Sequence, residues 1–345
     1  MIFFDILICL ILFIVPFMVF FCKTYHKRNL ISNVNDCKVL DLKYLFDDKK
    51  TANLHIIIGV YFACVYLAFR YLGSNWYVGS PLHIIAFLST LIMPFVLAYL
   101  CKGTKKVART VAIVLSGILL LSPLSRPFIW WANGGGAGLF WGEHPLTGVP
   151  QSVLTWEAAI PLNMSNLCAL LFLVSICTKN KMLVGFMVCV GLTGGVINNV
   201  NVNNGHMKVF WYYLTWESYF VHALMIIIPI FVLLTNQVEL KAKPTLKNYY
   251  WFIPWFLITG FLLNPLWGTN YNFTWYQKIL QKILPYLNHP IGFLNGQFDP
   301  LYMSCVLVLL SAMFVLFYFV GIGMTKISKR WYLKVDKNEH ERKIF

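Results

Sequence analysis

Apolar runs of membrane-spanning length alternate along this chain with short polar connections. A helix rises 1.5 Å per residue, so about 20 apolar residues cross a hydrocarbon core of about 30 Å. Segments near that length occur at residues 1–22, 55–73, 81–101, 107–123, 160–178, 182–200, 213–234, 249–266 and 299–324. The pattern therefore predicts an all-α polytopic transmembrane helical bundle of about nine spans.

Two connections are much longer than the others. Residues 125–157 are rich in tryptophan and contain a GGGAG run, which does not favour a regular helix. We interpret this segment as a flexible connector at the membrane interface. Residues 267–298 contain YQKILQKILPYL, whose spacing is typical of an amphipathic helix on a membrane surface.

Composition supports the membrane assignment. The chain has 345 residues, of which 59% are hydrophobic and only 12% are charged, whereas soluble domains carry about 25% charged residues. A net charge of +15 would suggest nucleic-acid binding if the basic residues formed one stripe on a soluble domain. They lie instead in short clusters between apolar runs, so we expect membrane lipids as partners and no nucleic acid.

The basic clusters predict the orientation. With the N-terminus outside and the C-terminus inside, the cytoplasmic segments hold 23 of the 28 Lys and Arg residues. Cytoplasmic loops are the basic ones in most membrane proteins. We therefore expect a multi-pass protein of the cell (plasma) membrane whose basic cytoplasmic segments contact anionic lipids. Nothing in the sequence sets the number of subunits.

The fifth span is unusually polar at its outer end, where Asn163, Ser165 and Asn166 precede an apolar run. Polar side chains at this depth usually face a partner helix or a wet cavity. His222 lies in the seventh span, with Ser218 one turn before it on the same face. A hydroxyl on one helix and an imidazole on the other could form a nucleophile–base pair.

Other polar residues near apolar segments are candidates for substrate binding. They are His83 in the third span, Asn264 at the end of the eighth and Asn270 just beyond it. The nine cysteines include no CxxC pair, and all but one sit in or at the ends of apolar segments, where a small buried hydrophobe is the usual role. We expect neither a metal site nor a cofactor.

Five segments together resemble the YwaF-like family of integral membrane proteins. They are SPLHIIAF around His83, IPLNMSNL around Ser165, the glycine-rich sixth span, FVHAL around His222, and NPLWGTNYNF after the eighth span, and they occur in the family's order. That family is also similar to an animal multipass acyltransferase that remodels ether phospholipids. The resemblance covers roughly residues 80–320.

The resemblance implies three parts. Residues 1–79 would be two additional N-terminal helices with a basic cytoplasmic connection, residues 80–324 a YwaF-like transmembrane core, and residues 325–345 a basic cytoplasmic tail.

The resemblance also implies acyl transfer or acyl hydrolysis on a membrane lipid. The family pattern in the fifth span is Pro-Leu-His-x-Cys, in which the cysteine is the proposed nucleophile of the animal enzymes. Here Asn163 stands in place of the histidine and Ser165 in place of the cysteine. Serine needs a base more than a thiol does, and His222 could supply it, with Asn163, Asn264, Asn270 and His83 around the substrate. The replacement is equally compatible with a lost catalytic site.

Two other functions remain open. A transporter or substrate-binding membrane component without chemistry is favoured by Pro94, Pro229 and Pro254 inside spans, because broken helices often line transport sites. The chain shows no internal repeat and no acidic residue at mid-membrane to couple ions. A membrane scaffold that uses the basic segments is the third possibility.

Overall fold

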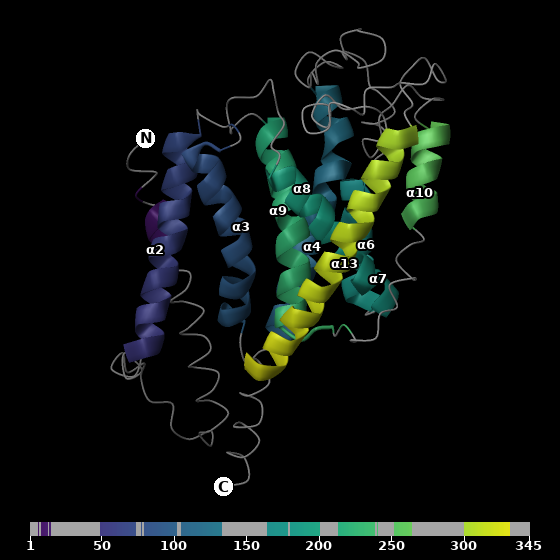
Figure 1. The fold of residues 1–345 in the computed structure, drawn as a ribbon. Coiled ribbons are helices and arrows are strands. Elements are labelled where there is room, and N and C mark those ends of the chain that lie inside the picture. The colour runs from purple at the N-terminus through teal and green to yellow at the C-terminus, as the bar shows by residue number, and fades with distance from the viewer. Residues whose placement is uncertain are drawn as a thin grey trace.

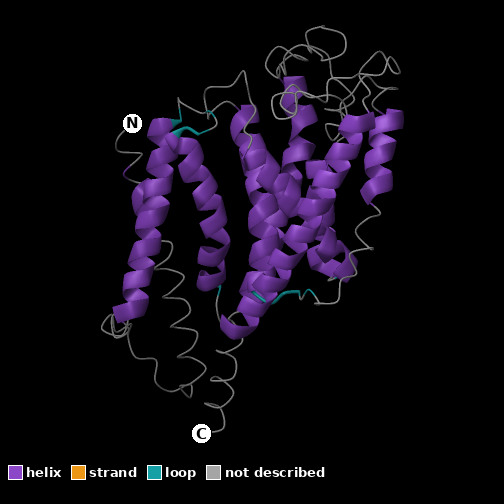
Figure 2. Cartoon of the chain, viewed as in Figure 1, coloured by secondary structure: helices purple, strands orange, loops and turns teal. Residues whose placement is uncertain are grey.

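A computed structural model describes residue 6, residues 8–12, residue 14, and residues 49–73, 77, 79–101, 105–132, 164–178, 180–200, 213–238, 240, 252–263 and 300–331. Within these ranges the regular elements are helices and there is no strand (Figure 2). The all-α prediction is therefore confirmed. Most of the first predicted span, residues 133–157 and the second long connection at 267–298 lie outside the described residues.

The described helices run alternately up and down (Figure 1). They are α2 (Lys49–Leu72), α3 (Pro81–Leu100), α4 (Lys105–Ala132), α6 (Met164–Thr178), α7 (Lys181–Phe186) continued by the π-helix η2 (Met187–Gly191) and α8 (Leu192–Val200), α9 (Tyr213–Leu234), α10 (Phe252–Ile258) continued by the π-helix η4 (Thr259–Leu263), and α13 (Pro300–Trp331).

Five helical stretches of the described chain are long and apolar enough to cross a membrane, at Asn53–Leu72, Pro81–Leu100, Lys105–Ser125, Leu183–Val200 and Ser304–Arg330. Shorter apolar helices cover Ser165–Thr178 and Ser218–Leu234. These stretches match seven of the predicted spans. The total of nine and the orientation stay predictions.

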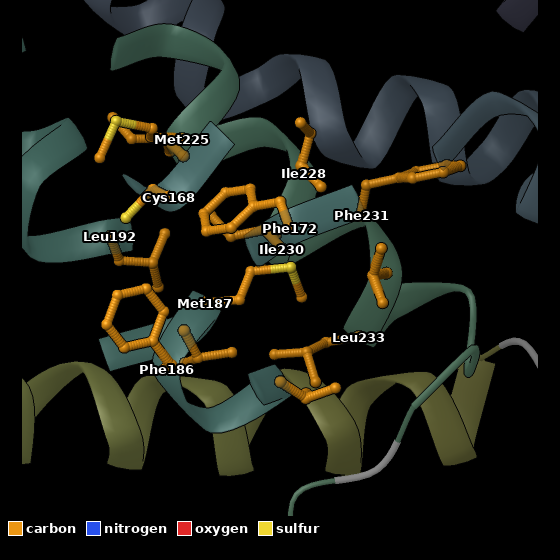
Figure 3. Packing of buried hydrophobic residues seen from close by; sticks show 14 of the residues in the cluster. Cys168, Phe172, Phe186, Met187, Leu192, Met225, Ile228, Ile230, Phe231 and Leu233 are labelled. Atoms are coloured by element: carbon orange, nitrogen blue, oxygen red, sulfur yellow. The ribbon is translucent and has the colours of Figure 1, made fainter. Parts of the chain in front are cut away.

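Helix α9 is the centre of the bundle. It packs against α3, α4, α6, α8, α13 and η2, and every residue from Met225 to Leu234 is buried. A helix that is apolar all round belongs in a core. Figure 3 shows how Met225, Ile228 and Phe231 of α9 interleave with side chains of α6 and η2 in this core.

Glycines let α8 approach α9 closely. A Cβ added at Gly195 would lie 2.9 Å from the backbone oxygen of His222 and 2.8 Å from Cγ1 of Ile226. Similarly, a Cβ at Gly191 would overlap the ring of Phe172 on α6. Small residues at helix contacts are typical of membrane bundles, where close backbone packing replaces the hydrophobic effect.

Three helices are longer than the sequence pattern predicts, and the first of them, α2, begins at Lys49 instead of at residue 55. Helix α4 continues to Ala132, so the interpretation of residues 125–132 as connector is wrong. The described part of this helix ends at Ala132. Helix α13 continues past residue 324 to Trp331, because lysine and arginine are good helix formers and favour a helix C-terminus.

Basic residues gather where α3, α9 and α13 end and α2 and α4 begin, the lower end in Figure 1, here called the basic end. Lys105 and Lys106 of α4 and Lys326, Lys329 and Arg330 of α13 are exposed there. A guanidinium N–H of Arg109 donates to the carbonyl of Cys177 at 3.4 Å, which suits the C-terminus of α6. The other end is called the opposite end.

Replacing Gly195 by alanine should destabilise the protein. The added methyl group meets backbone on α9, and overpacking of this kind costs about 1–3 kcal/mol. Thermal unfolding in detergent should show a lower midpoint. Gly323→Ala is the matched control, because nothing lies within 4 Å of its added Cβ and alanine stabilises a helix by about 0.5–1 kcal/mol relative to glycine. Equal midpoints for the two variants would contradict the packing argument.

The orientation can be tested with cysteines placed at the two ends. We expect Lys329→Cys, at the basic end, to react with a membrane-impermeant maleimide only after the cells are permeabilised. Tyr77→Cys, exposed near the opposite end, should react in intact cells. Labelling of the unmodified protein measures the background from the native cysteines. The reverse pattern would show that the orientation predicted from charge is wrong.

Candidate functional site

Helix α6 carries Ser165 and Asn166 in its first turns, at the opposite end of the bundle. Ser165 is half-buried and Asn166 is buried, with 4% of its surface exposed. Ser165, Cys168 and Phe172 share one face of α6, because residues three, four and seven apart are neighbours on a helix. Since Phe172 packs on Gly191, this face of α6 looks toward the η2–α8 helix.

His222 is half-buried on α9 and is oriented by its own helix. Its Nδ1 lies 2.7 Å from the carbonyl oxygen of Ser218. A carbonyl can only accept, so Nδ1 carries the hydrogen and, in the neutral ring, Nε2 carries the lone pair. An imidazole held in one tautomer in this way is suited to accept a proton at Nε2.

The positions of Ser165 and His222 along the bundle can be compared through the η2–α8 helix, which packs against both α6 and α9. Ser165 is seven residues, or about 10 Å, beyond Phe172 toward the opposite end. Gly195, which contacts the His222 carbonyl, is four residues, or about 6 Å, beyond Gly191 in the same direction. Side chains on α9 lean toward its N-terminus, so the imidazole lies at a depth similar to that of Ser165.

No hydrogen bond joins Ser165 to His222 within the described part of the chain. Catalytic hydrogen bonds are often long or poorly aligned until substrate binds. The two residues thus lie on contacting helices, α6 and α9, at the same end of the bundle. Their pairing as nucleophile and base stays a prediction.

Asn166 is the polar residue that stands out on structural grounds. Both its Oδ1 and its Nδ2 are buried and lack a hydrogen-bond partner. Protein mutational data put the cost of burying an unpaired amide at about 1–3 kcal/mol. The sequence placed Asn166 in the polar cluster of the fifth span but did not distinguish it from its neighbours, because burial cannot be read from residue type.

His83 joins the beginning of α3 to the end of α8. Its Nδ1 accepts a hydrogen bond from the backbone N–H of Gly79 at 3.1 Å, so Nε2 carries the hydrogen and donates to the carbonyl of Asn199 at 2.7 Å. Ser80 caps the same helix by accepting from the backbone N–H of His83 at 3.2 Å. Both ring nitrogens thus bind main chain, which is the arrangement of a structural cross-link. Its substrate-binding role stays a prediction.

A second buried polar contact joins α9 to α3. The hydroxyl of Tyr219 donates to the carbonyl of Ala86 at 2.7 Å and lies 2.7 Å from Oγ1 of Thr90. Its ring packs against Phe69 of α2, with centroids 5.8 Å apart. Sequence reasoning missed this contact, because a tyrosine in an aromatic-rich span carries no signal of its own.

Asn163, Asn264 and Asn270 lie outside the described residues.

These features define a multipass helical membrane protein whose polar side chains of interest gather at one end of the bundle. A family model described as the TMEM164 family matches residues 77–320, so the chain belongs to that membrane-protein family. The matched region begins just before α3 and ends within α13, leaving α2 outside it. No curated protein and no solved structure matches the chain.

We expect His83→Ala to lower the thermal unfolding midpoint. The change leaves the Gly79 N–H and the Asn199 carbonyl without the imidazole, and an unsatisfied buried polar group costs about 1–3 kcal/mol. His83→Gln should recover part of the loss, since its amide both donates and accepts. Ile84→Ala is the control, being half-exposed on the outer face of the same helix. A midpoint that His83→Ala leaves unchanged would rule out the cross-link.

Proposed function

We propose that this protein is a membrane-embedded acyltransferase or acyl hydrolase of YwaF-like type that acts on a lipid ester. Ser165 is the nucleophile and His222 the general base. The supporting observation is the hydrogen bond from His222 Nδ1 to the Ser218 carbonyl, which leaves the lone pair on Nε2. A free hydroxyl is a weak nucleophile, so an oriented base on a contacting helix is the feature that this chemistry requires.

The chemical step is ordinary acyl transfer. The Ser165 oxygen attacks the ester carbonyl carbon while its proton passes to Nε2 of His222. As the tetrahedral intermediate collapses, the carbon–oxygen bond to the lipid alcohol breaks and the imidazolium returns the proton to that alcohol. Water or the hydroxyl of a second lipid then attacks the acyl-serine in the same way. Water gives hydrolysis, and a lipid hydroxyl gives transfer.

Substrate reaches this site from the bilayer. Ser165 is only half-buried, and Leu170, little more than one turn further along α6, exposes 49% of its surface. One side of α6 therefore faces lipid while the Ser165 face turns toward α8. Asn163, Asn264, Asn270 and His83 are the proposed groups around the substrate.

Substrate binding or transport without chemistry is the second candidate. The spans made of α7–η2–α8 and α10–η4 each contain a π-helical segment, and such segments occur frequently at functional sites. In this case the polar groups of α6 and α9 would bind a ligand and release it unchanged.

The basic end supports a third proposal about partners. Exposed Lys105, Lys106, Lys326, Lys329 and Arg330 project there, and each basic residue near an anionic leaflet contributes about 1 kcal/mol of attraction. We propose that this end contacts anionic lipids of the cytoplasmic leaflet of the plasma membrane, an interaction a scaffold would share.

The first experiment is labelling of the detergent-solubilised protein with a lipid-like fluorophosphonate. Wild type should be labelled at one serine, and Ser165→Ala should abolish the labelling. His222→Ala should slow it by about 10²–10⁴-fold, the usual contribution of a general base. Ser304→Ala, an exposed serine of α13, is the control and should label like wild type.

Two results would contradict the enzyme proposal. One is labelling that persists in Ser165→Ala, which would place the reactive serine elsewhere. The other is an unlabelled wild type that also leaves ester lipids unchanged, which would favour binding or transport. Ser165→Cys distinguishes a nucleophile at another position from a site at residue 165 whose hydroxyl is inert. A thiol at this position should react with a lipid-like thioester even where the hydroxyl does not.

A further inference from the structure

We propose that the side chain of Asn166 binds the carbonyl oxygen of the substrate's acyl ester, with Nδ2 as the donor. This inference rests on the proposed function, because it assigns the substrate group next to Ser165. The observation behind it is a buried amide without any hydrogen-bond partner, one residue from the proposed nucleophile.

The missing partners require an explanation in a membrane protein. Hydrocarbon offers no water to satisfy a polar group, so an unpaired amide costs more free energy there than at a wet surface. Ser116, Ser175 and Ser328 also bury unpartnered hydroxyls, but a hydroxyl can rotate to suit a nearby acceptor, whereas an amide presents two fixed donors and an acceptor. Asn199 Oδ1 and Trp255 Nε1 are unpartnered as well, but each is a single atom, and the Nδ2 of Asn199 donates to the carbonyl of Gly195. Asn166 alone among the described residues leaves both ends of an amide buried and unpaired.

The chemistry of the surroundings indicates a neutral ligand group. The buried polar residues of the described chain are His, Ser, Thr and Asn, with no buried Lys, Arg, Asp or Glu. A phosphate or carboxylate taken out of water without a counter-charge would be too costly here. An ester carbonyl is neutral, accepts from an N–H, and is present in acyl lipids near the boundary between headgroups and hydrocarbon. Asn166 lies in the first turn of α6, which matches that depth.

The position of Asn166 also suits the reaction. A donor aimed at the carbonyl oxygen strengthens its hydrogen bond as negative charge develops on that oxygen, and the loss of one such donor slows acyl transfer by about 10²–10³-fold. Ser165 and Asn166 are consecutive on the helix, about 100° apart around its axis, so the hydroxyl and the amide can approach one carbonyl group from two sides.

The test compares two lipids with the same headgroup and chain length, a diacyl phosphatidylcholine and its dialkyl ether analogue, which lacks carbonyl oxygens. We expect the diacyl lipid to raise the thermal unfolding midpoint of wild type in detergent more than the diether does. Asn166→Leu should remove that difference while its midpoint without lipid stays equal or rises, because an apolar side chain of similar size replaces an unpaired amide.

Two further variants separate this inference from the proposed chemistry. Ser165→Ala should keep the ester preference, since binding does not need the nucleophile. Asn198→Leu should also keep it, because the Asn198 amide bonds only to the carbonyl of Gly194 in its own helix, at 3.0 Å. With the fluorophosphonate, Asn166→Leu should label about 10²–10³-fold more slowly than wild type.

Each outcome decides a different point. An ester preference that is absent in wild type, or that survives in Asn166→Leu, overturns the role of Asn166 even if Ser165 proves to be the labelled serine. An ester preference that depends on Asn166, in a protein that no fluorophosphonate labels, supports the carbonyl site and overturns catalysis by Ser165.

Discussion

The close approach of α8 and α9 at Gly195 sets the geometry on which the rest of the bundle depends. With no Cβ between the helices, the backbone of α8 lies against the carbonyl of His222. That contact fixes the depth of the imidazole relative to α8, and the Phe172–Gly191 contact fixes the depth of α6 against the same helix. Ser165 and His222 lie in the N-terminal halves of α6 and α9, which begin at the same end of the bundle, and the two glycine contacts hold these helices close to the η2–α8 helix.

The second constraint is that polar groups in hydrocarbon must find partners inside the protein. The bundle meets it with side chain to backbone bonds, such as those of His83 to Gly79 and Asn199 and of Tyr219 to Ala86. These bonds also connect α3 to α8 and α9, so the same hydrogen bonds satisfy the polar groups and join the helices. Against this background Asn166 differs from the other buried polar residues described in that both the donor and the acceptor of its amide lack a partner, which supports the ligand proposed for it.

The family match and the helix packing divide the chain in the same place. The TMEM164 family region covers residues 77–320, and it includes α3, α4, α6, η2, α8 and most of α13, which pack around α9. Helix α2 packs against α3 and touches α9 through the rings of Phe69 and Tyr219. It is attached to the side of the core, away from α6, and so lies apart from the proposed site.

The sequence by itself determined the class of protein and the places of most helices. A membrane span requires a long apolar helix, so the hydropathy of the sequence locates the spans directly. The sequence did not predict the beginning of α2 or the ends of α4 and α13, since a helix continues past the membrane wherever local residues allow. It also named Ser165, His222 and His83. Only the tertiary structure decided the burial and the hydrogen bonds of the polar side chains. His83 bonds to main chain at both nitrogens, His222 is held in one tautomer, and Asn166 is buried without a partner. Hydrogen bonding and burial depend on which helices meet and at what depth, and a single sequence records neither.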